Sequence, residues 1–174
     1  MLGVIKELIK RYKCYRNPVS YYRSVGVTIG RKCEIRGSVN FGSESYLIKL
    51  GEHVRINSGV QLITHDGGAW VLREYSKIPN RENITLVKRI IIGNNVHIGS
   101  NAMIMPGVTV GNNCIVGCGA IVTRDIPDNS VAVGVPARVI ETIDEYFEKH
   151  KGEFTYTKNM TKKEKKQFLL ENLK

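Results

Sequence analysis

The stretch "QLITHDGGAWVLRE", residues 61–74, gathers side chains that could carry out proton transfer. An imidazole titrates near neutral pH, so His65 is a candidate general base. The neighbouring Asp66 leaves three interpretations open, since its carboxylate could orient the imidazole, accept an Asx-turn hydrogen bond or bind a substrate. Trp70 offers an aromatic ring beside the base, either as a platform for a substrate or as an anchor for the chain. Whether these groups meet depends on the elements that position them.

A six-residue repeat surrounds this stretch. From Ile92 onward the chain divides into "IGNNVH", "IGSNAM", "IMPGVT", "VGNNCI", "VGCGAI" and "VTRDIP", and each unit begins with Ile or Val. An α-helix, with about 3.6 residues per turn, would scatter these residues over its surface. Short strands can instead point every first residue inward if three units complete one turn of a triangular prism. The fifth residue of each unit is also expected to point inward, so the sequence predicts an all-β fold of stacked coils.

The same frame appears earlier in the chain. It runs through residues 29–46 and 50–67, with three extra residues, Leu47 to Lys49, between the two stretches. Such an insertion predicts a bulge or a small loop at one corner of the prism.

The repeat fails over residues 68–85. A regular coil there would bury Glu74 without an evident partner, so these residues are expected to leave the coil as an extruded loop. Because the loop is as long as one full turn, the repeat is predicted to resume in phase at Leu86. That phase would place Asn101 one coil above His65.

The repeat run from residue 92 to 127, followed by "DNSVAVGVPARVI", resembles the left-handed β-helix acyltransferases. Over about residues 25–140 the chain is similar to the galactoside, maltose and xenobiotic acetyltransferases and to the O-acetyltransferases of bacterial surface polysaccharides. The resemblance implies a left-handed parallel β-helix that forms a homotrimer, with acetyl-CoA in the cleft between adjacent prisms. His65 matches the catalytic histidine of that family and would take the proton of a saccharide hydroxyl that attacks the thioester.

This assignment divides the chain into three parts. They are a helical N-terminal segment of residues 1–24, a β-helix domain of residues 25–140 with an extruded loop at about 68–85, and a helical C-terminal tail of residues 141–174. Residues 2–12 place apolar side chains on one helical face, and Thr161 and Glu164 have capping-box spacing. A basic amphipathic helix packs on a neighbour or lies on an anionic membrane, so a peripheral contact at the inner membrane face is left open.

The resemblance also assigns the donor site. CoA carries phosphates at one end and a pantetheine arm at the other, so it needs cations and a narrow groove. Arg124 in "VTRDIP" and Arg138 in "GVPAR" would supply the cations. Ser100, Cys118 and Thr123 are the positions that would line the groove. Cys118 can replace the small residue usual there, because a buried thiol behaves as a small hydrophobe.

Three residues are assigned to the acceptor. Asn40, in "VNFGS", is similar to the "NF" pair with which some sugar acetyltransferases contact their acceptor. Trp70 could stack on the apolar face of a pyranose. His97 occupies a place where the family often has Trp, so a smaller polar ring replaces an indole. The expected acceptor is a saccharide or a lipid-linked sugar.

The charge of the chain is lopsided, with 26 Lys and Arg against 16 Asp and Glu. Such an excess favours anionic partners. Nucleic acid is disfavoured, because the basic residues are dispersed and no recognition motif accompanies them. The sequence has 42% hydrophobic residues but neither an apolar run of membrane-spanning length nor a signal-peptide core. We therefore expect a cytoplasmic protein.

Metal chemistry is not indicated by the sequence. The four cysteines form no CxxC pair and have no histidine at zinc-ligand spacing. A metal-dependent hydratase would need three histidines that converge across a trimer interface, and His53, His65 and His97 lack the expected arrangement. Besides a saccharide O-acetyltransferase, two functions stay open: an N-acetyltransferase of an amino-sugar nucleotide or a xenobiotic, and a non-catalytic β-helix scaffold.

Overall fold

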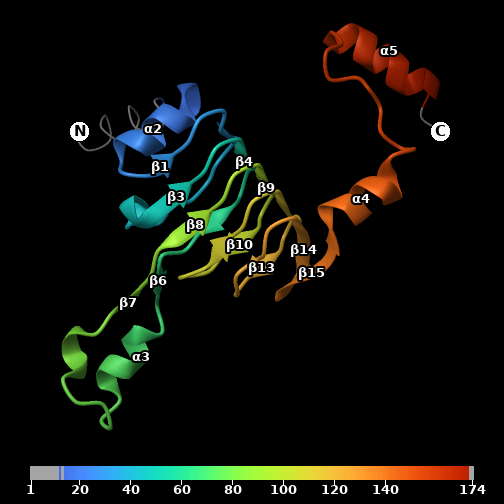
Figure 1. Cartoon of the computed structure of the whole chain (residues 1–174). Helices are drawn as coiled ribbons and strands as arrows, with labels where there is room; N and C mark the ends of the chain where they lie inside the picture. Colours follow the sequence, from blue (N-terminus) through green and yellow to red (C-terminus); the bar gives the residue numbers. More distant parts are fainter. Residues whose placement is uncertain (1–11, 13, 173–174) are drawn as a thin grey trace.

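The N-terminal end of the fold is covered by a short helix. The computed structural model describes residue 12 and residues 14–172 (Figure 1), so the amphipathic helix expected over residues 2–12 lies almost wholly outside the described residues. Helix α2 (Pro18–Ser24) packs on the first turn of the β-structure. Its Tyr22 is buried, and the Tyr22 hydroxyl donates to the carbonyl oxygen of Val39 at 2.6 Å.

Short strands form the three sides of a coiled stack (Figure 1). The first side consists of β1 (Thr28–Ile29), β3 (Ile48–Leu50), β8 (Ile90–Ile92) and β11 (Thr109–Val110). The second side consists of β2 (Glu34–Ile35), β4 (Val54–Ile56), β9 (Val96–Ile98), β12 (Cys114–Val116), β14 (Ser130–Gly134) and β15 (Ala137–Thr142). The third side consists of β5 (Gln61–Leu62), β10 (Met103–Ile104) and β13 (Ile121–Val122). Neighbouring strands within a side are parallel, except for the antiparallel pair β14 and β15.

Successive turns of the coil are related by constant offsets along the sequence. Between the third and fourth turns the partners lie 18 residues apart, as Asn94 and Asn112 do. Between the first and second turns the offset is 21 residues, as for Arg31 and Glu52. Between the second and third turns it is 42 residues on all three sides. The second turn is therefore 24 residues longer than the third, the difference between 42 and 18, because it carries an excursion.

This excursion is longer than the sequence pattern indicates, and the prediction of an in-phase restart at Leu86 is wrong. Leu86 belongs to β7 (Leu86–Val87), which pairs antiparallel with β6 (His65–Asp66) and makes a two-stranded neck. The coil resumes at Lys88, whose backbone N–H donates to the carbonyl oxygen of Thr64 at 2.8 Å. A hexapeptide pattern cannot distinguish a strand of the neck from a strand of the coil, because both are short and β-branched or aliphatic.

Every residue above the excursion is shifted by one repeat unit relative to the prediction. Asn101, expected above His65, lies above Gly59, and its backbone N–H donates to the carbonyl oxygen of the preceding Ser58 at 3.0 Å. The tip of the excursion contains α3 (Ala69–Glu74) and the 3-10 turn η2 (Arg81–Asn83). Figure 1 shows this tip projecting well away from the coil.

The first and fifth residues of the repeat units form the core, as the sequence predicts. The first residues are 1% exposed or less, namely Ile92, Ile98, Ile104, Val110, Val116 and Val122. The fifth residues are 5% exposed or less, namely Val96, Ala102, Val108, Cys114, Ala120 and Ile126. Their side chains stack on those of the turns above and below, so the coil is filled along its whole length.

Two helices follow the last strand. Helix α4 (Ile143–His150) starts at a capping box formed by Thr142 and Glu145. Helix α5 (Lys162–Asn172) comes after an extended segment and lies apart from the coil (Figure 1). Thr161 and Glu164 exchange both capping hydrogen bonds at its start. None of the helices in the described part of the chain is long and apolar enough to cross a membrane.

Candidate active site

The two insertions of the chain lie at the same corner of the prism, one directly above the other. In the first turn the chain passes from the third side at Asn40 to the first side at Lys49, and this passage contains the three extra residues. The passage contains the 3-10 turn η1 (Ser45–Leu47), which follows Glu44, whereas Ile48 and Lys49, expected in a bulge with Leu47, belong to strand β3. In the second turn the same corner carries the excursion, which begins at His65. The stacking of turns therefore brings Glu44 close to His65, although the two residues are 21 positions apart.

The carboxylate of Glu44 is the partner of the His65 imidazole. His65 Nδ1 lies 3.0 Å from Glu44 Oε2, and the buried Thr64 hydroxyl donates to the same oxygen at 2.8 Å. The Ser43 hydroxyl donates to the other oxygen, Oε1, at 2.9 Å. The His65 side chain is 50% exposed, so the ring is held at one nitrogen and open to solvent elsewhere.

These hydrogen bonds keep the carboxylate ionised. The bond from Thr64, followed by those from His65 and Ser43, lowers the pKa of Glu44 from 4.5 to about 2. A negative charge therefore stands beside the imidazole throughout the neutral range. Sequence reasoning missed Glu44. Glu44 could have been found from the two breaks in the repeat, because the extra residues of the first turn and the excursion of the second turn leave the coil at the same corner.

Of the three roles considered for Asp66, the structure shows the Asx-turn hydrogen bond. Its Oδ1 accepts from the backbone N–H of Gly68 at 2.7 Å, which closes an Asx turn at the start of the excursion. The contact with the His65 ring thus comes from Glu44 and not from Asp66. Trp70 lies on α3 at the tip of the excursion, where its side chain is 75% exposed.

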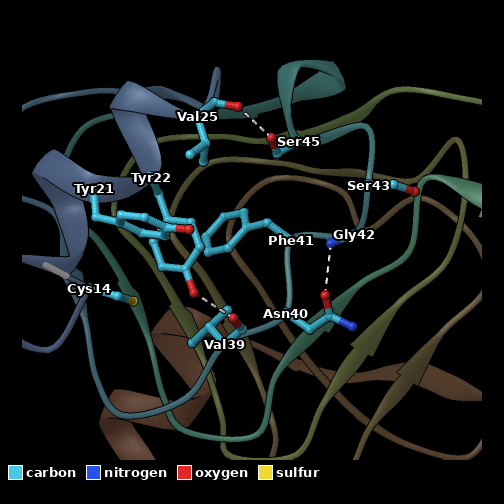
Figure 2. A pocket seen from close by; sticks show the side chains of 10 residues that line it. All are labelled: Cys14, Tyr21, Tyr22, Val25, Val39, Asn40, Phe41, Gly42, Ser43 and Ser45. Carbon is cyan, nitrogen blue, oxygen red and sulfur yellow. Dashed lines mark hydrogen bonds between the residues drawn. The ribbon is translucent and has the colours of Figure 1, made fainter. Parts of the chain in front are cut away.

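A cavity of about 500 Å³ adjoins this corner, between α2 and the first turn (Figure 2). Figure 2 shows the rings of Tyr22 and Phe41 facing each other on one side, with centroids 4.2 Å apart. Asn40 lies on the other side, and its Oδ1 accepts from the backbone N–H of Gly42 at 2.9 Å. Ser43 lines the cavity and its hydroxyl also donates to Glu44, so one residue links the cavity to the carboxylate that contacts His65.

The predicted donor residues occupy two different corners of the chain. Ser100 and Cys118 lie between the second and third sides on successive turns, where Gly119 N–H donates to the Ser100 carbonyl oxygen at 2.8 Å. The Cys118 thiol is exposed in the single chain, not buried as expected, because it stands at a corner and does not point into the core. Thr123 and Arg124 are exposed and follow β13, at the corner that carries His65 two turns earlier. The third side of the prism separates the two pairs.

Arg138, the remaining donor residue, lies on β15, and its Nη1 donates to the carbonyl oxygen of Ala137 at 2.8 Å. Its side chain is exposed near the end of the coil. The guanidinium can therefore turn toward a bound anion at the cost of one surface hydrogen bond.

His97 lies on the second side of the prism, away from the corner of His65. It faces Arg55 on the turn below and Ile115 on the turn above. Partial burial, followed by the charge of Arg55, lowers the pKa of His97. It lines a second cavity, of about 550 Å³, together with His53. Within one chain the structure thus does not bring His97 together with His65.

Across residue 12 and residues 14–172, no group of three or more His, Cys, Asp or Glu side chains is placed to hold a metal ion. His53, one of the residues considered for such a site, is exposed at a corner and has a positive φ of 55°. Its Nδ1 lies 2.8 Å from Asn95 Oδ1, at the end of a ladder of amide side chains that runs up the corner.

Comparison with known proteins identifies the family. Residues 89–124 match the family model described as bacterial transferase hexapeptide (six repeats). The chain is 39% identical to the galactoside O-acetyltransferase of Escherichia coli (strain K12) over 141 residues, which are 78% of this chain and 66% of that protein. It is 47% identical to protein CapG of Staphylococcus aureus over 154 residues, which are 87% of each protein. The chain belongs to the hexapeptide-repeat acyltransferases. As an acyltransferase of this superfamily it is an enzyme.

The structure is similar to solved hexapeptide-repeat acetyltransferases. A maltose O-acetyltransferase from Clostridium difficile 630 superposes with a TM-score of 0.57 and 27% sequence identity, covering 74% of this chain and 75% of that one. The chain thus resembles the hexapeptide-repeat acyltransferases in its fold as well as in its sequence repeat.

Proposed function

We propose that this hexapeptide-repeat acyltransferase transfers an acetyl group from acetyl-CoA to a hydroxyl of a saccharide, with His65 as the general base. The observation that carries the proposal is the state of His65, whose ring is fixed at Nδ1 and half exposed at a corner between a rigid coil and an excursion. The galactoside and maltose O-acetyltransferases among its relatives support a sugar acceptor and an ester product.

The proposed reaction is a direct transfer. The unpaired nitrogen of His65, Nε2, removes the proton of the acceptor hydroxyl, and the oxygen attacks the thioester carbonyl. The tetrahedral intermediate collapses, the carbon–sulfur bond breaks and the imidazolium returns the proton to the departing CoA thiolate. The base is regenerated in each cycle.

The cavity beside Asn40 supplies a site for the acceptor. The partly exposed ring of Tyr21 offers an apolar surface suited to one face of a pyranose, while Asn40 and Ser43 offer polar groups at its edge. Ser43 also binds Glu44, so a sugar in this cavity would have its hydroxyls within reach of the corner. We infer that this cavity holds the acceptor. Trp70 lies at the tip of the excursion, which projects away from its own coil (Figure 1), so in a homotrimer it would contact an acceptor held by a neighbouring subunit.

The proposed architecture is a left-handed parallel β-helix of residues 25–140, preceded by a helical segment of residues 1–24 and followed by a helical tail of residues 141–174. In a homotrimer the groove lined by Ser100 and Cys118 of one subunit would face the corner of the next. That arrangement would unite the two groups of donor residues that one chain keeps apart, and it would give His97 access to the shared site.

The proposed function is tested by following free-thiol release from acetyl-CoA with a panel of acceptors. Sugars with free hydroxyls are expected to release CoA, whereas matched sugars in which these hydroxyls are methylated are not. Transfer to amino sugars alone would point to N-acetylation instead and would overturn the proposal.

The donor site gives a first prediction. Replacement of both Arg124 and Arg138 with Gln is expected to weaken acetyl-CoA binding by about tenfold or more at low salt, because two charge-assisted contacts are lost. The difference from the unmodified enzyme should shrink as salt rises, since salt screens exposed charges. Calorimetric titration with acetyl-CoA measures both effects. Arg31→Gln, which removes a cation paired with Glu52 at another corner, is the matched control. Unchanged affinity in the double variant would remove these arginines from the donor site.

The excursion gives a second prediction. Residues 67–85 can be replaced with an Asn-Gly turn, because β6 and β7 already pair as an antiparallel hairpin. The shortened enzyme is expected to keep its acetyl-CoA affinity, while KM for the acceptor rises by about tenfold, which corresponds to about 1.4 kcal/mol of lost binding. Trp70→Ala should reproduce much of this rise. A fall in kcat with an unchanged acceptor KM would show that the excursion serves the chemistry and does not capture the acceptor.

A further inference from the structure

Glu44 is held more firmly than a surface carboxylate needs to be. Its two oxygens accept three hydrogen bonds, from Thr64, His65 and Ser43. The following residue is anchored as well, since the buried Ser45 hydroxyl donates to the carbonyl oxygen of Val25 at 2.6 Å. The Glu44 carboxylate is thus fixed by its own hydrogen bonds, and the backbone after it is fixed by the bond of Ser45.

We propose that Glu44 is the positioning residue of His65: its carboxylate holds the ring in the tautomer with hydrogen on Nδ1 and thereby directs the lone pair of Nε2 to the acceptor hydroxyl. This inference rests on the proposed function, since it assigns the group through which the general base is oriented. It extends that function by assigning a catalytic support to the first-turn segment that leads into η1.

The chemistry of the donor and acceptor atoms determines the tautomer. An ionised carboxylate can only accept hydrogen bonds, so the nitrogen 3.0 Å from Glu44 Oε2 must carry the hydrogen. In a neutral ring the other nitrogen is then the proton acceptor, which is the form a general base requires. The low pKa of Glu44, about 2, keeps the carboxylate in its accepting form at every pH at which the enzyme would work.

The same oxygen is oriented from the buried side. Thr64 is 0% exposed, and its hydroxyl donates to Glu44 Oε2, the oxygen that faces the imidazole. Thr64 is also the residue whose carbonyl oxygen receives the returning chain at Lys88. His65, its carboxylate partner Glu44 and the point where the excursion closes therefore meet at one corner of the prism.

The decisive comparison is between Glu44→Ala, Glu44→Gln and Glu52→Ala. Glu44→Ala removes the acceptor and is expected to lower kcat by about 10- to 100-fold, with KM for acetyl-CoA and for the acceptor nearly unchanged. Glu44→Gln keeps one carbonyl oxygen for Nδ1–H and should restore part of the rate. Glu52→Ala, which removes an exposed carboxylate of the second turn that pairs with Arg31, should leave kcat as it is.

A spectroscopic measurement separates positioning from simple structural support. In protein labelled with ¹⁵N-histidine, the neutral ring of His65 is expected to show hydrogen on Nδ1, and Glu44→Ala should shift it toward the form with hydrogen on Nε2. The signals are assigned by their loss in His65→Ala. Because the first spectrum needs only the unmodified enzyme, the test stands even where a variant fails to fold.

The outcomes distinguish the two proposals. Hydrogen on Nε2 in the unmodified enzyme, or unmodified kcat in Glu44→Ala while His65→Ala is inactive, would overturn the role of Glu44 and leave the general base in place. A rise in acceptor KM alone would also overturn it, since Glu44 would then bind the acceptor. An active His65→Ala enzyme would instead remove the proposed function on which this inference rests.

Discussion

The His65→Ala variant is expected to transfer acetyl groups about 10²- to 10⁴-fold more slowly, while acetyl-CoA affinity stays nearly unchanged. An acceptor hydroxyl is a poor nucleophile at neutral pH. In the proposed mechanism His65 is the group that removes its proton, so the variant lacks a general base. Donor binding should persist, because the His65 side chain is half exposed and adds no packing to the core. Thiol-release kinetics give the rate, and calorimetric titration gives the affinity.

The matched control for this variant is His150→Ala. His150 lies at the end of α4, where its Nδ1 is 2.8 Å from Glu153 Oε2, and it has no part in the proposed site. This change should leave both rate and affinity intact. If His65→Ala keeps the full rate with a verified acceptor, the base is another residue and the corner of the prism is not the active site.

The Ile92→Ala variant is expected to lose about 2–5 kcal/mol of unfolding free energy, the largest effect on stability that we predict. Ile92 is 1% exposed and lies between Leu50 on the turn below and Val110 on the turn above. Removal of its side chain leaves a cavity in a core that is only one prism wide, so few neighbours can move to fill it. Denaturant unfolding of the two proteins measures the difference.

Ile91→Ala is the control, because the same residue type stands one position earlier on the same strand. Ile91 points out of the prism and is 41% exposed, so its truncation should cost about 0.5 kcal/mol or less. Equal losses in the two variants would contradict the inward and outward alternation of β8. That alternation is the basis of the core assignment.

The sequence is most informative about the coil. A six-residue period with Ile or Val in first place can be satisfied by a three-sided stack and not by a helix, and residues such as Ile98 and Val116 are buried as that period requires. The phase above the excursion was predicted wrongly by one unit, because β7 has the composition of a coil strand but pairs with β6. The residue pattern shows the six-residue period. Which strand β7 pairs with depends on where the chain re-enters the coil after the excursion.

The candidate site could be predicted only in part. His65 was found because a base, a loop and a break in the repeat coincide there. Glu44 was not found, because it precedes the insertion expected at Leu47 to Lys49, and the repeat pattern does not show that the chain already leaves the coil at Glu44. Only the register of the stacked turns places Glu44 against His65. A contact between adjacent turns depends on how the turns are aligned, and a local sequence pattern does not show that alignment.

The excursion of the second turn leaves the strand pairing around it undisturbed, since the offset of 42 residues is the same on all three sides. A segment that leaves and re-enters at one corner adds length to the sequence without rotating or translating any later turn. The fold is therefore modular: one contiguous peptide can be exchanged for another of different length while the distances between all remaining corners persist. Under the proposed function, an exchange of the excursion would therefore change the contacts that Trp70 makes with the acceptor, while His65 and Glu44 keep their positions at the corner.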